Sequence, residues 1–258
     1  MEEFENMKVI VTGAGCGIGF EICKQFAQNG ALVGLNDIDG KKAIDAAKCI
    51  NAELQQDLVT PLAFDIADLD QAQKAIEKFS NGKLDIFVAN AGITTFSSFL
   101  ETRAEEFEKL TQVNLKGTYF SVQAAAKEMI KSQSNGSIVL MSSVTGIQAH
   151  RNLSAYGMTK AAIRMLTKSL SEELGDFGIN VNAVGPGATL SERTVKDDPV
   201  YAQGWRNVAP NRMVGKPEDV AHTVLFLANE KSAHISGEII MVDGGWTITS
   251  PLPEHLKD

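Results

Sequence analysis

The first forty residues constrain the fold most, because a β-branched run, a glycine-rich turn and a helical repeat follow one another directly. Residues 8–12, KVIVT, predict a buried strand that runs into the turn at residues 13–19, GAGCGIG. Apolar side chains then recur at every fourth position, the spacing of one helix face (Ile18, Ile22 and Phe26). A second apolar run, residues 31–35, predicts the next strand. The chain therefore opens with a strand–turn–helix–strand unit.

The glycine turn and an acid after the second strand together predict a dinucleotide site. Glycines allow the backbone to approach a pyrophosphate, whose charge is held at the N-terminus of the following helix. Asp37 follows the second strand, where an acid accepts hydrogen bonds from ribose hydroxyls. The alternative for Asp37 is a cap on the next helix. A P-loop is disfavoured, because no Gly-Lys-Ser/Thr ends the turn.

Strand and helix patterns alternate along the rest of the chain, which predicts a parallel sheet with helices on both faces. The fold class expected is a single-domain α/β Rossmann fold with a seven-stranded parallel sheet, spanning residues 1–258. Pro61 suggests a position near the sheet edge or at the start of its strand. The expected strands are residues 8–12, 31–35, 59–64, 84–89, 137–141, 179–184 and 238–242. The expected helices after the first are residues 39–55, 68–79, 102–131, 156–174 and 217–229.

Ligands of such sheets bind beyond the carboxyl ends of the strands, and the polar residues of this chain gather at those positions. They are Gly13, Asp37, Asp65, Asn90, Ser143 and residues 185–187. The longest stretch without a predicted element, residues 186–216, is called the lid segment below. A loop of that length in a compact domain is usually functional, so we expect it to cover the substrate.

Tyr156 and Lys160 lie four residues apart in a predicted helix, hence one turn apart on the same face. A nearby ammonium favours the phenolate form of a tyrosine, which can then exchange a proton with a hydroxyl or carbonyl. Such pairs are also common on ordinary helices, so the pair gains weight only from the rest of the chain.

Composition argues against several classes of partner and site. The net charge of −8 and the isoelectric point near 5.1 disfavour a nucleic-acid backbone or an anionic membrane. Three cysteines without metal-type spacing favour a reduced, cytoplasmic setting and no metal site. No apolar run reaches the roughly 20 residues that span a bilayer, and the acidic N-terminus lacks a signal region. We expect a soluble intracellular protein.

Several short motifs, in this order and spacing, resemble those of the short-chain dehydrogenase/reductase superfamily. The resemblance runs from about residue 8 to 246. The motifs are residues 12–19 TGAGCGIG, residues 90–92 NAG, Asn114, Ser143, Tyr156 with Lys160, and residues 186–187 PG.

The resemblance implies a catalytic role for four residues. Tyr156 would be the general acid/base, and Lys160 would favour its phenolate and hold the nicotinamide ribose. Ser143 would hydrogen-bond the substrate oxygen, although a turn hydroxyl that bonds local backbone is the alternative, one that fits Ser142 better. Asn114 would kink its helix and hold a water that joins Lys160 to solvent, or it would only cap or bend the helix.

The resemblance also implies the cofactor site, and the residues favour NAD(H) over NADP(H). The Asp37 carboxylate would repel a 2′-phosphate, and neither Cys16 nor Asn36 offers a positive charge, although Lys41 and Lys42 could partly compensate. For Asp65, with Ile66 expected to contact adenine, a helix cap is the alternative. The expected cofactor residues are Gly13, Gly15, Cys16, Gly17, Ile18, Gly19, Asp37, Ile38, Asp65, Ile66, Asn90, Ala91, Gly92, Tyr156, Lys160, Pro186, Gly187 and Thr189.

Polar groups around the expected pocket favour a polyhydroxylated substrate such as an aldose or polyol. The expected substrate residues are Thr94, Ser143, His150, Asn152, Tyr156 and Trp205. For His150 a solvent-facing loop position is the favoured alternative, and Trp205 is expected to pack the lid segment down rather than stack on a sugar. Parts of the chain look like members called glucose 1-dehydrogenases.

Other functions stay open at this stage. A 3-oxoacyl-carrier-protein reductase would need a basic surface near the pocket, which Arg151, Arg193 and Arg206 could provide, although Asp37 weighs against NADPH. A non-catalytic dinucleotide sensor would typically lose Tyr156 or Lys160, and a methyltransferase would not require them. The resemblance also implies a homotetramer or homodimer.

Overall fold

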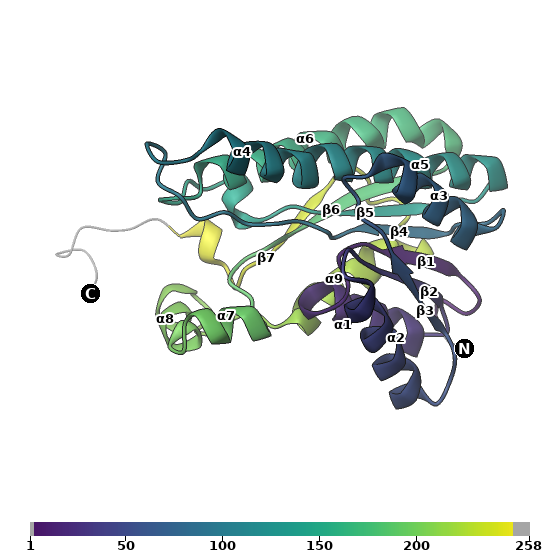
Figure 1. Ribbon diagram of the computed structural model, residues 1–258, viewed down its shortest axis with the longest axis horizontal. Coiled ribbons are helices and arrows are strands. Elements are labelled where there is room, and N and C mark those ends of the chain that lie inside the picture. The colour runs from purple at the N-terminus through teal and green to yellow at the C-terminus, as the bar shows by residue number, and fades with distance from the viewer. Residues whose placement is uncertain (1–2, 250–258) are drawn as a thin grey trace.

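The computed structural model describes residues 3–249, except the side chains of residues 192, 193 and 197. Its centre is a seven-stranded, all-parallel sheet in the order β3-β2-β1-β4-β5-β6-β7 (Figure 1). The predicted fold class is therefore confirmed, and Pro61 lies in the edge strand β3 as expected. The strands are β1 (Lys8–Val11), β2 (Leu32–Asp37), β3 (Val59–Ala63), β4 (Ile86–Ala89), β5 (Ser137–Met141), β6 (Asn180–Pro186) and β7 (Ile239–Val242).

Helices cover both faces of the sheet. Figure 1 shows α3, α4, α5 and α6 in one layer and α1, α2 and α9 in the other, with α7 and α8 beside the sheet. The helices are α1 (Gly17–Gln28), α2 (Gly40–Leu54), α3 (Leu69–Ser80), α4 (Ala104–Thr111), α5 (Thr118–Ser132), α6 (Ser154–Leu174), α7 (Glu192–Asp197), α8 (Tyr201–Val208) and α9 (Pro217–Ala228).

The sheet has an apolar core on each of its two faces, which explains why its strands are continuous apolar runs in the sequence. Along β1, Val9 and Val11 point into the core with α1, α2 and α9, whereas Ile10 points into the core with α3, α5 and α6. All three side chains are fully buried. A strand with helices on both faces has no polar face, so its sequence lacks the alternation of a half-exposed strand.

The predicted helix over residues 102–131 is divided in the structure. A π-helical segment, Gln112–Gly117, separates α4 from α5. A Cβ built at Gly117 would lie 2.8 Å from Cγ1 of Ile66, so the missing side chain lets this segment approach the turn after β3. The lid segment also differs from a plain loop, because it contains α7 and α8 and a β-bridge between Thr189 and Gly215.

None of the helices in residues 3–249 is long and apolar enough to cross a lipid bilayer.

A matched pair of isoleucines on α2 tests the packing of this layer. Ile50 is fully buried and Ile44 is 43% exposed. We expect Ile50→Ala to lower the free energy of unfolding by about 2–5 kcal/mol, because it removes buried methyl groups and leaves a cavity. Ile44→Ala should cost less than about 1 kcal/mol. Urea unfolding at one fixed protein concentration measures both, and equal losses would contradict the assigned burial.

Candidate active site

The glycine turn leaves the N-terminus of α1 open. Gly13 and Gly17 both have φ of +62°, which favours glycine. A Cβ at Gly13 would lie 2.7 Å from the Cα of Ala91, whereas a Cβ at Gly17 would meet no described atom within 4 Å. Cys16, exposed, precedes α1 and makes no side-chain capping bond. The amide groups at Gly17, Ile18 and Gly19 therefore begin a helix whose N-terminus can take an anion such as a pyrophosphate.

Hydrogen bonds between Thr12 and Asn90 hold this turn against the end of β4. The Asn90 amide Nδ2 donates to the carbonyls of Thr12 (2.9 Å) and Gly13 (2.8 Å). The Thr12 hydroxyl accepts from the main-chain N–H groups of Asn90 and Ala91, both at 3.1 Å. Thr12 was not among the expected site residues, although it lies at the carboxyl end of the first predicted strand, where site residues were expected.

The Asp37 carboxylate lies against the glycine turn. Its Oδ2 accepts from the main-chain N–H of Gly15 at 3.1 Å, and its Oδ1 accepts from that of Asp39 at 2.9 Å. Asp39, not Asp37, caps α2, through the N–H groups of Lys41 and Lys42. Asp37 therefore does not cap α2, which was the alternative role considered for it. The neighbouring residue Ile38 is 70% exposed.

The two residues expected to contact the cofactor after β3, Asp65 and Ile66, are less exposed than Ile38. Asp65 Oδ1 accepts from the main-chain N–H of Ala67 at 2.8 Å, and the following helix is capped by Asp68 instead. Ile66 is 5% exposed and packs against Gly117. A contact between Ile66 and adenine would use only that small open fraction of its surface.

Lys160 is buried at the centre of the site. It is 5% exposed, and its Nζ donates to the carbonyl of Met141 at 2.8 Å. The Nζ also lies 5.6 Å from the centre of the Tyr156 ring. Among the described residues no carboxylate forms an ion pair with it. A Cβ at Gly92 would lie 3.5 Å from this Nζ, so residues 90–92 and Lys160 adjoin one another.

The two adjacent serines make different contacts, and only one of them makes the local turn contact. Ser142 Oγ donates to the main-chain carbonyl of Lys160 at 3.1 Å and so ties β5 to α6. Ser143 Oγ accepts from the main-chain N–H of Thr145 at 3.2 Å, which is the local turn contact expected of Ser142. That prediction was wrong, because the turn begins at Ser143. The Ser143 hydroxyl donates to no described residue, so its proton is available to a substrate oxygen.

Two glycines allow the turn at residues 144–146 to pack on α6 beside Tyr156. A Cβ at Gly157 would lie 2.9 Å from the carbonyl oxygen of Thr145. A Cβ at Gly146 would lie 2.9 Å from the main-chain carbonyl of Lys160. The close approach brings the segment that begins at Ser143 onto the turn of α6 that carries Tyr156.

Asn114 lies within the π-helical segment and links it to two other parts of the site. Its Nδ2 donates to the carbonyl of Ile93 (2.9 Å) and to Thr159 Oγ1 (3.2 Å), and its Oδ1 accepts from the N–H of Ile93 (2.8 Å). A π turn is a common cause of a helix kink, the role that the resemblance implies for Asn114. Both amide hydrogens are used within the protein, so a bound water would have to donate to a carbonyl oxygen of this residue.

The polar residues expected around the substrate pocket lie in different settings. Thr94 is half-buried, and Asn152 is exposed with φ of +64°, its carbonyl accepting from the N–H of Ser97 at 3.0 Å. Among the expected cofactor residues, Thr189 is 9% exposed, and its hydroxyl donates to the carbonyl of Gly187. The main-chain N–H of Gly187, which follows Pro186 at the end of β6, donates to Val242.

His150 and Trp205 are joined by Trp246, which sequence reasoning missed. The Trp246 ring centre lies 4.8 Å from that of His150 and 4.5 Å from that of Trp205. His150 Nε2 is buried without a partner among the described residues, and burial lowers the pKa of this imidazole. The expectation of a solvent-facing histidine was therefore wrong, whereas Trp205 packs the lid segment as expected. Position 246, directly after Gly244 and Gly245, carried no motif.

Arg151 and Arg206, the basic residues weighed for an acidic partner, are exposed. The side chain of Arg193 lies outside the described residues.

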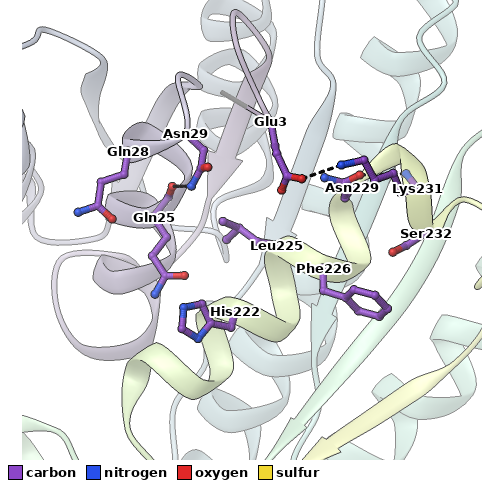
Figure 2. A pocket seen from close by; sticks show the side chains of 10 residues that line it. All are labelled: Glu3, Gln25, Gln28, Asn29, His222, Leu225, Phe226, Asn229, Lys231 and Ser232. Atoms are coloured by element: carbon purple, nitrogen blue, oxygen red, sulfur yellow. Dashed lines mark hydrogen bonds and ion pairs between the residues drawn. The ribbon is translucent and has the colours of Figure 1, made fainter. Parts of the chain in front are cut away.

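The cleft drawn in Figure 2 is separate from this site. It has a volume of about 520 Å³ and lies between the C-terminal halves of α1 and α9, near the Glu3–Lys231 ion pair (Figure 2). Those helix ends lie at the amino edge of the parallel sheet, opposite the strand ends that carry Asp37, Asn90 and Ser143. None of the expected site residues lines it. Among the described residues, no group of three His, Cys, Asp or Glu could hold a metal ion.

Comparison with known proteins agrees with this arrangement. The family model described as Enoyl-(acyl carrier protein) reductase matches residues 13–247. A 3-oxoacyl-(acyl-carrier-protein) reductase of Thermotoga maritima is 36% identical, over 95% of this chain and 99% of its own. An L-rhamnose 1-dehydrogenase (NAD(P)(+)) of a Sphingomonas species is 37% identical, over 95% of this chain and 98% of its own.

The solved structures give the same result. A gluconate 5-dehydrogenase of Burkholderia cenocepacia, in complex with NADP and tartrate, superposes with a TM-score of 0.89 at 30% identity, covering 96% of this chain and 99% of that one. With this likeness over nearly the whole length, the chain belongs to the short-chain dehydrogenase/reductase family and is an oxidoreductase that acts on alcohol or carbonyl substrates with a nicotinamide dinucleotide.

Proposed function

We propose that the chain transfers a hydride between NAD(H) and a secondary alcohol or its carbonyl, with a sugar or polyol as substrate and Tyr156 as general acid/base. The observation that carries the catalytic part is the buried Lys160 ammonium, held by the Met141 carbonyl and 5.6 Å from the Tyr156 ring. A buried cation without a paired carboxylate among the described residues is costly, so a functional role is its best explanation.

The proton steps follow from the residues around Tyr156. The bound dinucleotide supplies the hydride acceptor or donor. In the oxidation direction the Tyr156 phenolate, with the Lys160 ammonium beside it, accepts the hydroxyl proton of an alcohol substrate. In the opposite direction the Tyr156 phenol donates that proton to the carbonyl oxygen. The free hydroxyl hydrogen of Ser143 would bond the same oxygen and stabilise its developing charge.

The residues of the turn fit a dinucleotide. The open space at Gly17 and the uncapped start of α1 suit its pyrophosphate, and the Asp37 carboxylate suits ribose hydroxyls. The same carboxylate supports the preference for NAD(H), since it would repel a 2′-phosphate. Lys42 weighs against this preference. Its Cβ would lie 3.1 Å from a Cβ built at Gly15, so this positively charged side chain starts beside the glycine turn, where it could pair with a 2′-phosphate. The rhamnose and gluconate dehydrogenases above carry NAD(P) or NADP in their names.

The proposal of a sugar or polyol as substrate rests on the polar residues near the site and on those two relatives, whose names include rhamnose and gluconate. A 3-oxoacyl-carrier-protein reductase is the second candidate, favoured by the reductase of Thermotoga maritima and by the exposed Arg151 and Arg206.

A homodimer or homotetramer in the cytoplasm is also proposed. An apolar groove on α5 and α6, lined by Leu115, Tyr119, Phe120, Ala162 and Leu166, supports self-association.

A substrate panel tests the activity. NAD⁺ reduction is followed by absorbance with aldoses, aldonates, polyols and simple alcohols, and NADH oxidation with acetoacetyl thioesters. We expect turnover of at least one sugar or polyol. Turnover of thioesters alone would replace this substrate class with the reductase function. Dinucleotide binding without any turnover would instead favour a sensor.

Tyr156→Phe tests the proton step. We expect kcat to fall about 10²–10⁴-fold, because the phenolic oxygen that exchanges the proton is gone while the ring is kept. Dinucleotide affinity, measured by calorimetry, should stay within about threefold. Tyr119→Phe on α5, where the ring is 46% exposed, is the matched control and should retain full kcat. Equal kcat in both variants would remove Tyr156 from the chemistry.

Asp37→Ser tests the cofactor preference. We expect the ratio of kcat/KM with NADP⁺ to that with NAD⁺ to rise at least about tenfold, equivalent to about 1.4 kcal/mol, because the repelling carboxylate is removed. Asp39→Ser is the control, since it removes the neighbouring carboxylate that caps α2. An unchanged ratio in Asp37→Ser, or the same rise in Asp39→Ser, would contradict the assignment.

A further inference from the structure

Three aromatic side chains from distant parts of the chain form one stack at the edge of the site. His150, Trp205 and Trp246 are called the aromatic stack below. Trp246 is its middle member, with the Trp205 ring edge-to-face at 69° and 4.5 Å, and the His150 ring tilted at 48° and 4.8 Å. Such geometries are favourable between rings.

The stack joins the lid segment to the segment that carries the catalytic residues. Trp205 lies on α8, whereas His150 lies between Ser143 and Tyr156 in the sequence. A second contact runs parallel to the first, because Gln148 Nε2 donates to the carbonyl of Thr247 at 3.2 Å. Trp246 thus connects a short surface helix with the segment that leads to Tyr156.

Trp246 itself is held rigidly by the turn after β7. The Asp243 carboxylate accepts from the N–H of Gly245 (2.9 Å) and from both the N–H (2.8 Å) and the hydroxyl (2.6 Å) of Thr247. Gly245 has φ of +85°, which places Trp246 at the start of a short 3-10 segment. The main chain that carries the indole is therefore held by hydrogen bonds within the turn after β7.

The lid segment, by contrast, has few other anchors at α8. No residue of α8 is buried, and Val200 and Val208 at its two ends are 68% and 49% exposed. After α8, Ala209 is buried, and the N–H of Asn211 donates to the carbonyl of Gly244 at 3.2 Å. The Trp205 ring lies 4.5 Å from that of Trp246 and 6.0 Å from that of Tyr201 in the same helix, so Trp205 connects α8 to the turn after β7.

We propose that Trp246 is a positioning residue that latches α8 of the lid segment over the substrate site through Trp205. The inference rests on the proposed function, since it names the part of the chain that closes over the same site. Among the described residues, no hydrogen bond or ring contact joins Trp246 to Tyr156, Lys160 or the glycine turn, so we expect its loss to act on substrate affinity. When only a fraction of the molecules hold α8 in the closed position, the apparent dissociation constant of the substrate equals its intrinsic value divided by that fraction.

Trp246→Leu and Trp205→Leu test the latch through two readouts. We expect the substrate KM to rise about tenfold in each, with kcat changed less than threefold and dinucleotide affinity within threefold. The double variant should be no worse than the more affected single one, because both break the same contact. Trp246→Phe, which keeps an aromatic ring, should restore most of the substrate affinity.

Limited trypsin digestion, analysed by mass spectrometry, is the readout that needs no activity. Arg206 and Arg212 in the lid segment are exposed, and cleavage there requires local opening of the backbone. We expect cleavage at these two sites to accelerate at least about fivefold in Trp246→Leu. Phe177→Leu, which alters an exposed aromatic residue outside the lid segment, should leave the rate unchanged.

The outcomes separate this inference from the proposed function. Unchanged cleavage in Trp246→Leu would overturn the latch, whether or not any substrate is turned over. Faster cleavage with an unchanged substrate KM would overturn the positioning role. Failure of the whole substrate panel, with the expected change in cleavage, would remove the proposed function and leave the latch as a structural contact.

Discussion

The hydrogen bonds between Thr12 and Asn90 hold together the part of the molecule on which the site depends. They lie where the strand order reverses, since β1 is flanked by β2 on one side and β4 on the other. In a parallel sheet the loops after β1 and β4 must diverge to opposite faces there, which opens a crevice. Thr12 and Asn90 fix both walls of that crevice. The glycine turn and residues 90–92 are therefore held in place before any ligand arrives.

Close backbone approach is the second requirement, and glycine provides it at both halves of the site. In the dinucleotide half, Gly13 lets the turn lie against Ala91. In the catalytic half, Gly146 and Gly157 bring the turn after β5 onto α6. A larger residue at any of these positions would separate segments that must be within hydrogen-bond distance. Each half of the site is thus held together by close main-chain packing.

Local polar contacts decide which of several similar residues is available for function. Asp39 and Asp68 cap α2 and α3, so Asp37 and Asp65 need not. Ser142 ties β5 to α6, which leaves the Ser143 hydroxyl free to donate. In each case one residue of a similar pair satisfies the fold, and its neighbour faces the site. This division cannot be seen in the sequence, because both members have the same chemistry.

The sequence by itself determined the order of the seven strands and the placing of polar residues at strand ends, and it limited Pro61 to a sheet edge or a strand start. These follow from local patterns, namely apolar periodicity, glycine turns and the rule that parallel strands end on one edge. Only the tertiary structure decided the roles of Ser142 and Ser143, the π-helical segment at Asn114 and the burial of the Nε2 atom of His150. Each depends on a partner distant in sequence, such as Lys160, Ile93 or Trp246, and local patterns carry no record of such contacts.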